Sequence, residues 1–253
     1  MSTTPFGPPE WLVDAPYDDV DHGPLTTGKE AQVNLVERVG ADGRSCLIAR
    51  KRYLPRTVTY KGQLEAMGVQ RVSAFTHDVQ YREGRQFRKS RDRRAVERMS
   101  TYGKHLLQDR WTGMEHDVMS KLWARGVAVP YPVAYADDVF DLEYIGDLDR
   151  AAPQLRAARL SGAELRDAFD QLLVGLRGIT AAGYAHGDLS AYNLLWWDGR
   201  LVFIDFPQAV DIAANPAGLE FLHRDITNVC DYFTSRGLDV DAEEVFADAL
   251  SFM

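Results

Sequence analysis

The dipeptide Asp198-Gly199 is the feature that most constrains how this chain can fold. It stands between two strand-like runs, and both central positions of a type I′ turn need a positive φ, which Asp-Gly adopts readily. The pair therefore predicts a β-hairpin with a two-residue turn. Closing that turn brings Asn193, at the start of the first strand, beside Asp205, at the end of the second.

Asp188 lies in the loop that leads into this hairpin, so three oxygen-bearing side chains converge. Phosphoryl transfer needs a carboxylate to accept or orient the incoming hydroxyl proton, and oxygen ligands to hold Mg²⁺ against nucleotide phosphates. Asp188 fits the first role, and Asn193 and Asp205 fit the second. The alternative is that they only cap an ordinary hairpin. It does not explain why Asp205 follows the apolar run 201–204, where an unpaired carboxylate is costly.

The composition limits the classes of protein to which this chain can belong. A chain of 253 residues that is 45% hydrophobic can build one compact unit, or two small lobes that share a cleft. The net charge of -8 argues against a global attraction to nucleic acid or to anionic membranes. Cys46 and Cys230 form no metal-ligand spacing, and no apolar run approaches the roughly 18 residues of a membrane span. We therefore expect a reduced, cytoplasmic protein.

The N-terminal half shows a change of pattern along the chain. Residues 1–24 are rich in proline, which predicts an extended arm, and the folded part is expected to begin after it. Residues 31–53 alternate and turn at 40–43, which predicts a β-hairpin. Residues 55–108 have no sustained period and contain many arginines, which predicts a long loop with short helical pieces.

A helix is predicted between Trp111 and Arg125, with Gly126 at its C-terminus. Glu115 lies on the apolar stripe of this helix together with Trp111, Val118 and Leu122. A carboxylate that faces the core is costly unless it is paired, so Glu115 requires a cation from another part of the fold. Further along, Gly146 is the expected hinge between two halves, and a second helix is predicted around 162–182.

Taken in order, these segments resemble the RIO-type protein kinases over nearly the whole chain after the N-terminal arm. The similar segments are Thr27-Gly-Lys-Glu-Ala31-Gln-Val33, Ala49-Arg-Lys51-Arg-Tyr53, Trp111-Thr-Gly-Met-Glu115, Gly126-Val-Ala-Val-Pro130-Tyr-Pro, Leu142-Glu-Tyr-Ile-Gly146, the His186 to Asn193 loop, Ile204-Asp-Phe-Pro-Gln208 and Leu219-Glu-Phe-Leu-His-Arg-Asp225.

The resemblance implies an α+β, two-lobed protein-kinase-like fold. The expected divisions are an arm over 1–24, an N-lobe with a small antiparallel sheet over 25–145, and a reduced, mainly helical C-lobe over 146–253. It also implies an ATP- and magnesium-dependent serine/threonine protein kinase, in which Mn²⁺ could replace Mg²⁺. Asp188 would be the catalytic base, and Asn193 and Asp205 the metal ligands.

The resemblance also assigns the nucleotide contacts. Lys51 would contact the phosphates and pair with Glu115, which supplies the cation that the helical stripe requires. Backbone at the hinge would bind adenine, and one loop would cover the phosphates. The remaining nucleotide-binding residues are Glu143 and Ile145 at the hinge, and Gly28, Lys29, Glu30, Ala31 and Val33 in the loop.

Two stretches imitate other motifs. Residues 23–30 have P-loop spacing, but Glu30 stands where a hydroxyl must bind Mg²⁺, and a strand pattern follows where a helix is required. His223-Arg-Asp225 resembles a kinase catalytic triplet, yet Cys230 replaces the metal-binding asparagine. We interpret Asp225 as a structural residue and expect a helix cap.

The chain also departs from ordinary protein kinases. Ser190 replaces a lysine that many of them keep near the transferred phosphate, so we expect slow turnover. The family resemblance also suggests an ATP-hydrolysing switch in which Asp205 itself takes the phosphoryl group. Two alternatives remain. One is a small-molecule kinase of the aminoglycoside or choline phosphotransferase type, which the short segments around the catalytic loop disfavour. The other is a non-catalytic nucleotide-binding scaffold.

The sequence does not identify the group that accepts the phosphoryl group, and an unknown protein acceptor is expected. The basic segment 82–98 would suit RNA, a ribosomal partner or an acidic protein, whereas a solvated insertion is the alternative. Ser90, Ser100 and Thr101 are candidates for autophosphorylation.

Overall fold

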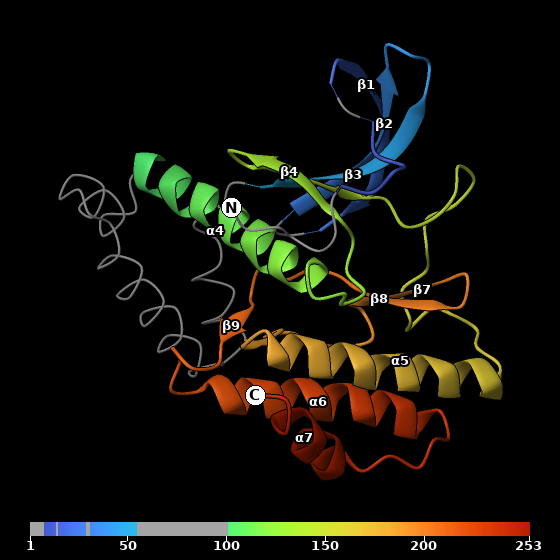
Figure 1. Ribbon diagram of the computed structural model, residues 1–253, viewed down its shortest axis with the longest axis vertical. Helices are drawn as coiled ribbons and strands as arrows, with labels where there is room; N and C mark the ends of the chain where they lie inside the picture. Colours follow the sequence, from blue (N-terminus) through green and yellow to red (C-terminus); the bar gives the residue numbers. More distant parts are fainter. Residues whose placement is uncertain (1–7, 14, 29–30, 55–100) are drawn as a thin grey trace, which may run out of the picture.

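The structure is a computed structural model that describes residues 8–13, 15–28, 31–54 and 101–253, the side chains of 101–111 excepted. The described residues form two lobes, one built on a β-sheet and the other on packed helices, with helix α4 between them (Figure 1). This is an α+β, two-lobed arrangement, and it confirms the predicted fold class.

The N-lobe sheet is antiparallel, with the strand order β1-β2-β3-β5-β4. Helix α4 lies between β3 and β4 in the sequence and contacts β4 and β5. The bounds of these elements are β1 Tyr17–Thr27, β2 Ala31–Gly40, β3 Ser45–Tyr53, α4 Thr101–Trp123, β4 Pro132–Ala136 and β5 Val139–Glu143.

The C-lobe is mainly helical, as predicted. Two short two-stranded sheets lie between its helices and the N-lobe, with β6 paired to β9 and β7 paired to β8. Its elements are α5 Gly162–Ala181, β6 Tyr184–Ala185, β7 Leu194–Trp197, β8 Arg200–Phe203, β9 Val210–Asp211, α6 Gly218–Ser235 and α7 Ala242–Leu250. Among the described residues, no helix has both the length and the apolar character that a membrane crossing demands.

The helix ends follow from local hydrogen bonding. The Ser161 hydroxyl accepts from the Glu164 N–H, and the Glu164 carboxylate accepts from the Ser161 N–H, so a capping box begins α5. Gly126, with φ +74°, stops α4, and the next N–H, that of Val127, donates to the Leu122 carbonyl at 3.1 Å. This is the Schellman arrangement. It confirms the predicted role of Gly126.

Helix α4 begins at Thr101, so the prediction of a long loop with short helical pieces was wrong for residues 101–108, which belong to a continuous helix. Its first turns carry no apolar period, but residues 104–110 include Lys, Leu, Gln and Arg, which propagate a helix readily once a neighbouring segment is helical. The predicted basic segment 82–98 lies outside the described residues, and so do Ser90 and Ser100, two of the candidate autophosphorylation sites.

Both predicted hairpins are confirmed. In the first, β2 pairs with β3 and sets Val33 opposite Lys51. In the second, β7 pairs with β8 across a two-residue turn, at which Asp198 has φ 48° and Gly199 has φ 72°. Positive φ at both positions is the mark of a type I′ turn.

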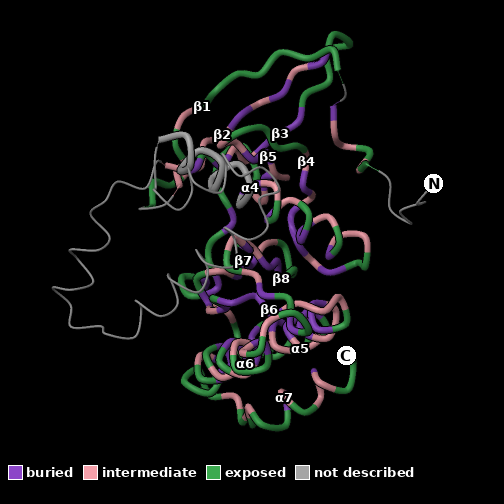
Figure 2. Tube along the Cα trace, turned by 90° about the vertical axis from the view of Figure 1, so that its left-hand side faces the viewer, coloured by how far each residue is buried: buried purple, intermediate pink, exposed green. Residues whose placement is uncertain are grey.

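The extended arm predicted over 1–24 is too long, because residues 17–27 form β1. This strand pairs with β2 at the edge of the sheet, where a proline such as Pro24 breaks no ladder on its outer side. Figure 2 shows that β1 is largely exposed. A strand also replaces the helix that a P-loop would need after residues 23–30, which confirms that this stretch is no P-loop.

The core runs through both lobes. Phe140 of β5 and Met119 and Leu122 of α4 join the same buried cluster as Leu172 of α5 and Phe203 of β8. A β-carbon on Gly175 of α5 would lie 2.2 Å from the Phe203 ring, so glycine permits the close approach of helix and hairpin. A second cluster, of Val13, Val36, Cys46 and Ile48, lies within the N-lobe, so the folded part begins before β1.

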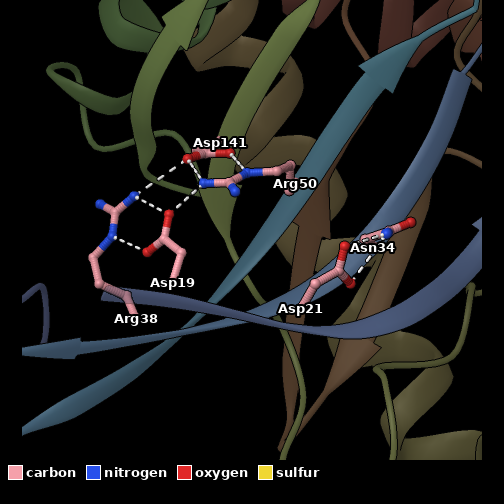
Figure 3. Close-up of polar contacts among 6 residues, drawn as sticks. All are labelled: Asp19, Asp21, Asn34, Arg38, Arg50 and Asp141. Atoms are coloured by element: carbon pink, nitrogen blue, oxygen red, sulfur yellow. Dashed lines mark hydrogen bonds and ion pairs between the residues drawn. The ribbon is translucent and has the colours of Figure 1, made fainter. Parts of the chain in front are cut away.

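Charged side chains cross-link four strands of the N-lobe sheet (Figure 3). Asp19 of β1 accepts from Arg38 of β2 at 3.0 Å and from Arg50 of β3 at 2.6 Å. Asp141 of β5 accepts from Arg50 at 2.8 Å and from Arg38 at 3.3 Å. Arg38 and Asp141 are buried, so each charge depends on its partners.

We predict that Arg38→Met destabilises the fold by about 2 kcal/mol, because it leaves Asp141 buried with one fewer cation. Urea denaturation at neutral pH measures the loss. The matched control is Arg44→Met, which removes an arginine whose ion pair with Asp42 is exposed, and it should change the free energy of unfolding much less. Equal losses in the two variants would contradict a special role for the buried network.

Candidate active site

Lys51 and Glu115 form a buried ion pair between the sheet and α4. The Lys51 ammonium, on β3, lies 2.9 Å and 3.1 Å from the two carboxylate oxygens of Glu115. The Glu115 side chain is fully buried. The prediction that Glu115 needs a cation is therefore confirmed, and Lys51 provides it.

Glu115 also accepts hydrogen bonds from two further groups. The Phe206 N–H donates to it at 3.0 Å, and the Tyr53 hydroxyl is another donor. Tyr53 was not among the predicted site residues. It follows Lys51 by two positions in the same strand, and side chains at that spacing share one face of a sheet. That spacing is the signal that could have identified it.

Asp205 lies at the other side of Lys51. Its Oδ1 atom is 2.6 Å from the Lys51 ammonium, and its side chain is 45% exposed. Partial burial by itself would raise the pKa of the Asp205 carboxyl, but attraction and hydrogen bonding to Lys51 outweigh this effect and lower it. Burial also disfavours a charged Lys51, yet Glu115 and Asp205 together raise the pKa of its ammonium well above the usual value. Lys51 and Asp205 are therefore both charged at neutral pH.

Asp205 adopts a left-handed backbone conformation, with φ 69°. Aspartate tolerates this region better than most residues with a β-carbon. The conformation ends β8 and turns the chain. With this backbone conformation, the Asp205 carboxylate accepts from Lys51, and the next N–H, that of Phe206, donates to Glu115.

The β7–β8 hairpin brings the remaining predicted groups to Asp205. The Ile204 N–H donates to the Asn193 carbonyl at 3.0 Å, so Asn193 lies beside the residue before Asp205. The Asn193 amide Nδ2 donates to the Asp188 carbonyl at 2.7 Å. This bond leaves the Asn193 Oδ1 as an acceptor with no partner among the described residues. The hairpin geometry predicted from Asp198-Gly199 therefore assembles Asp188, Asn193 and Asp205.

Helix α6 holds the loop that carries Asp188. The Asp225 carboxylate accepts from the Gly187 N–H at 2.7 Å and from the Leu189 N–H at 3.0 Å, and Arg224 donates to the Gly187 carbonyl. Asp225 is therefore structural, as predicted, but it is no helix cap: it lies inside α6 and binds the loop instead. Sequence could not reveal this contact, since Asp225 and the loop are far apart in the chain.

Two other features fix the loop. The His186 imidazole Nε2 lies 3.0 Å from the Ile204 carbonyl, and its ring packs on Phe206 at 4.4 Å. Gly187 has φ 85°, and a β-carbon there would lie 2.1 Å from the Gln208 carbonyl oxygen. A glycine is therefore required immediately before Asp188.

Asp188 itself is exposed to solvent. Partial burial of the Asp188 carboxyl raises its pKa, and the nearby Asp205 carboxylate raises it further. His186 and Arg224 act in the opposite direction without reversing the shift. A carboxylate with a raised pKa binds a proton more readily, which is the property that a general base needs.

The donor set suits a hard divalent ion. Mg²⁺ prefers oxygen ligands and commonly takes one or two from the protein, with the rest from waters and phosphates. Here Asn193 offers its Oδ1 atom, and Asp205 offers the Oδ2 atom that Lys51 does not engage. Clusters of at least three His, Cys, Asp or Glu side chains fit to hold a metal are absent from the described part of the chain. A metal ion held by Asn193 and Asp205 would take its other ligands from waters or phosphates.

Of the residues predicted to contact adenine and the phosphates, Gly28, Ala31 and Val33 lie just after β1 and in β2, and Glu143 and Ile145 lie at and after the end of β5. Val33 of β2 is paired with Lys51, and the Gly28 N–H donates to the Ala31 carbonyl at 2.8 Å where β1 turns into β2. Lys29 and Glu30 lie outside the described residues. At the hinge, the Glu143 side chain accepts from the Tyr131 N–H, and the Ile145 carbonyl accepts from the Ala152 N–H. Both the carboxylate of Glu143 and its N–H, which donates to the Tyr131 carbonyl at 2.8 Å, are engaged with Tyr131.

Comparison with known proteins identifies the family. The family model of the RIO domain matches residues 61–245, which is more than half of the chain. The RIO-type serine/threonine-protein kinase Rio1 of Haloferax volcanii is 31% identical over 239 residues, which cover 93% of this chain and 70% of that protein. The Thermoplasma acidophilum Rio1 is 33% identical over 135 residues, covering 53% of this chain and 69% of its own length. The Caenorhabditis elegans serine/threonine-protein kinase RIO1 is 29% identical over 219 residues, covering 86% and 38% respectively. The chain therefore belongs to the family of RIO-type serine/threonine-protein kinases.

Proposed function

We propose that this chain transfers the γ-phosphoryl group of ATP to a serine or threonine hydroxyl of a protein, with Mg²⁺ as the metal ion. The observation that carries the proposal is the position of Lys51, which is 2.9 Å from Glu115 on one side and 2.6 Å from Asp205 on the other. A lysine held in this way is oriented to meet a phosphate beside a metal-binding carboxylate.

Each residue then has a distinct task. Lys51 binds the phosphates, and Glu115 orients Lys51. Asn193 and Asp205 hold the metal ion, whose charge offsets the negative charge of the phosphates. The hinge backbone at Glu143 and Ile145 binds adenine, and the turn from Gly28 to Val33, with Lys29, Glu30 and Ala31, covers the phosphates.

Asp188 acts on the acceptor. The acceptor oxygen attacks the γ-phosphorus, the bond from that phosphorus to the ADP oxygen breaks, and the hydroxyl proton passes to the Asp188 carboxylate. The exposed position of Asp188 leaves room for a hydroxyl carried by a large partner. This supports a protein acceptor, in agreement with the names of the relatives.

The other functions are not favoured. A small-molecule kinase and a non-catalytic scaffold both lack support from the relatives, which are named serine/threonine-protein kinases. The switch role, with Asp205 taking the phosphoryl group, stays a hypothesis that rests on its unengaged Oδ2 atom. Label from radioactive ATP that resists hydroxylamine would count against it. A cytoplasmic location and an RNA or ribosomal partner also remain predictions.

We predict that Asp188→Asn lowers kcat by about 10²- to 10⁴-fold while ATP binding is retained, because the base is lost and the phosphate contacts are not. Metal-dependent ADP release and peptide phosphorylation measure kcat, and a fluorescent nucleotide measures binding. Asp170→Asn, which changes an exposed aspartate on α5, should leave both unchanged. Full activity in Asp188→Asn would show that another group is the base.

The rate should also depend on pH through Asp188. Because the base works when deprotonated and its pKa is raised, kcat/KM should fall on acidification at a higher pH than for an ordinary aspartate. A pH profile of ADP release at constant ionic strength measures this acid limb. The Asp170→Asn control should keep the limb, and the residual activity of Asp188→Asn should lack it. A limb that persists in Asp188→Asn would assign it to another group.

Tyr53→Phe should raise the KM for ATP and lower kcat/KM by about 3- to 10-fold, since one hydrogen bond that orients Glu115, and through it Lys51, is removed. Steady-state kinetics with ATP as the varied substrate measures the effect. Tyr135→Phe, at a largely exposed tyrosine of β4, is the matched control and should behave as wild type. An unchanged KM in Tyr53→Phe would mean that Lys51 and Phe206 suffice to hold Glu115.

A further inference from the structure

A pair of arginines lies beside the loop that the acceptor must approach. Arg156 is held there by its backbone, whose N–H donates to the Ala191 carbonyl at 3.0 Å. Its guanidinium lies over the Tyr192 ring, 4.5 Å from the centroid, and donates to the Tyr192 hydroxyl. Tyr192 is 48% exposed and belongs to the same loop as Asp188.

The second arginine, Arg236, follows α6 and meets Arg156. Its Nη2 atom donates to the Arg156 carbonyl at 3.3 Å, and its guanidinium lies 4.8 Å from the Tyr232 ring centroid. The Tyr232 hydroxyl donates in turn to the Leu155 carbonyl at 2.8 Å. We call these four residues, Arg156, Tyr192, Tyr232 and Arg236, the arginine–tyrosine shelf.

The backbone under the shelf is rigid. The Leu155 N–H donates to the Leu194 carbonyl at 2.7 Å, and Gln154 forms a bridge with Leu195 of β7. The shelf is therefore tied to the hairpin that carries Asn193 and Asp205. A ligand bound on it keeps a fixed position relative to the catalytic groups.

The charge of the shelf is not neutralised from within the described residues. Arg38, Arg50 and Arg177 each form ion pairs with carboxylates. Arg156 and Arg236 form none with any described residue, and both are exposed. A guanidinium group that lies on an aromatic ring and has no carboxylate partner suits the carboxylate of a bound peptide.

We propose that the arginine–tyrosine shelf recognises an acidic side chain next to the serine or threonine that is phosphorylated. The inference rests on the proposed kinase function and names its substrate class: a peptide segment with glutamate or aspartate near the acceptor hydroxyl. A protein partner is favoured over RNA because the shelf offers only two cations and the chain as a whole carries a net charge of -8.

Peptide binding tests the proposal independently of turnover. The full chain, with Mg²⁺ and a non-hydrolysable ATP analogue, is titrated into fluorescent peptides that contain one serine flanked on both sides by glutamates or by glutamines. The glutamate peptide should bind about tenfold more tightly, because charge-assisted hydrogen bonds are stronger than neutral ones. Added salt should reduce the preference.

The double variant Arg156→Gln/Arg236→Gln should abolish the preference, while Arg125→Gln, at an exposed arginine at the end of α4, should keep it. Thermal unfolding checks that both variants are folded. A wild-type protein without preference, or a double variant that retains it, overturns the proposal. So does a double variant that loses only the binding of an oligouridine, since the shelf would then contact nucleic acid.

The two proposals fail in different ways. Asp188→Asn should keep the preference for the glutamate peptide over the glutamine peptide, because the base acts on the acceptor hydroxyl and not on the flanking side chains. ADP release that is independent of Asp188, with the peptide preference intact, would reject the kinase mechanism and leave the shelf standing. Asp188-dependent ADP release with no peptide preference would reject the shelf alone.

Discussion

The buried ammonium of Lys51 is the interaction on which the rest of the site depends. A charge in that position is costly unless it is paired on every side, and its partners come from different parts of the chain. Glu115 belongs to α4, and Asp205 follows the C-lobe hairpin. The sheet, the helix and the hairpin must therefore all be in place together. The arrangement ties the two lobes at the point where the nucleotide phosphates are proposed to bind.

Around this centre, two sets of contacts limit movement. In the C-lobe, Asp225 accepts from the two N–H groups that flank Asp188, so α6 holds the loop that carries Asp188. In the N-lobe, the network of Asp19, Arg38, Arg50 and Asp141 links the strands on the face opposite Lys51. Successive residues of a strand point to opposite faces, so Arg50 contacts Asp19 and Asp141 while Lys51 contacts Glu115 and Asp205.

Local patterns predicted a large part of this structure. Asp198-Gly199 predicted the hairpin, Gly126 predicted the end of α4, and the apolar stripe around Glu115 predicted a buried carboxylate in need of a cation. The errors have physical causes too. The proline-rich start concealed β1, because an edge strand tolerates proline, and the first turns of α4 have no apolar period to identify them.

The sequence by itself determined the local conformations and the types of chemical group, because turns, caps and periodicity depend on residues that are close together in the chain. Only the tertiary structure decided which groups meet. Asp225 was expected to cap a helix, and it binds the Asp188 loop instead, since packing of α6 places it there. Tyr53 contacts Glu115, and Arg236 meets Arg156, for the same reason. Contacts across long sequence separations depend on how whole elements pack, and no local pattern encodes that packing.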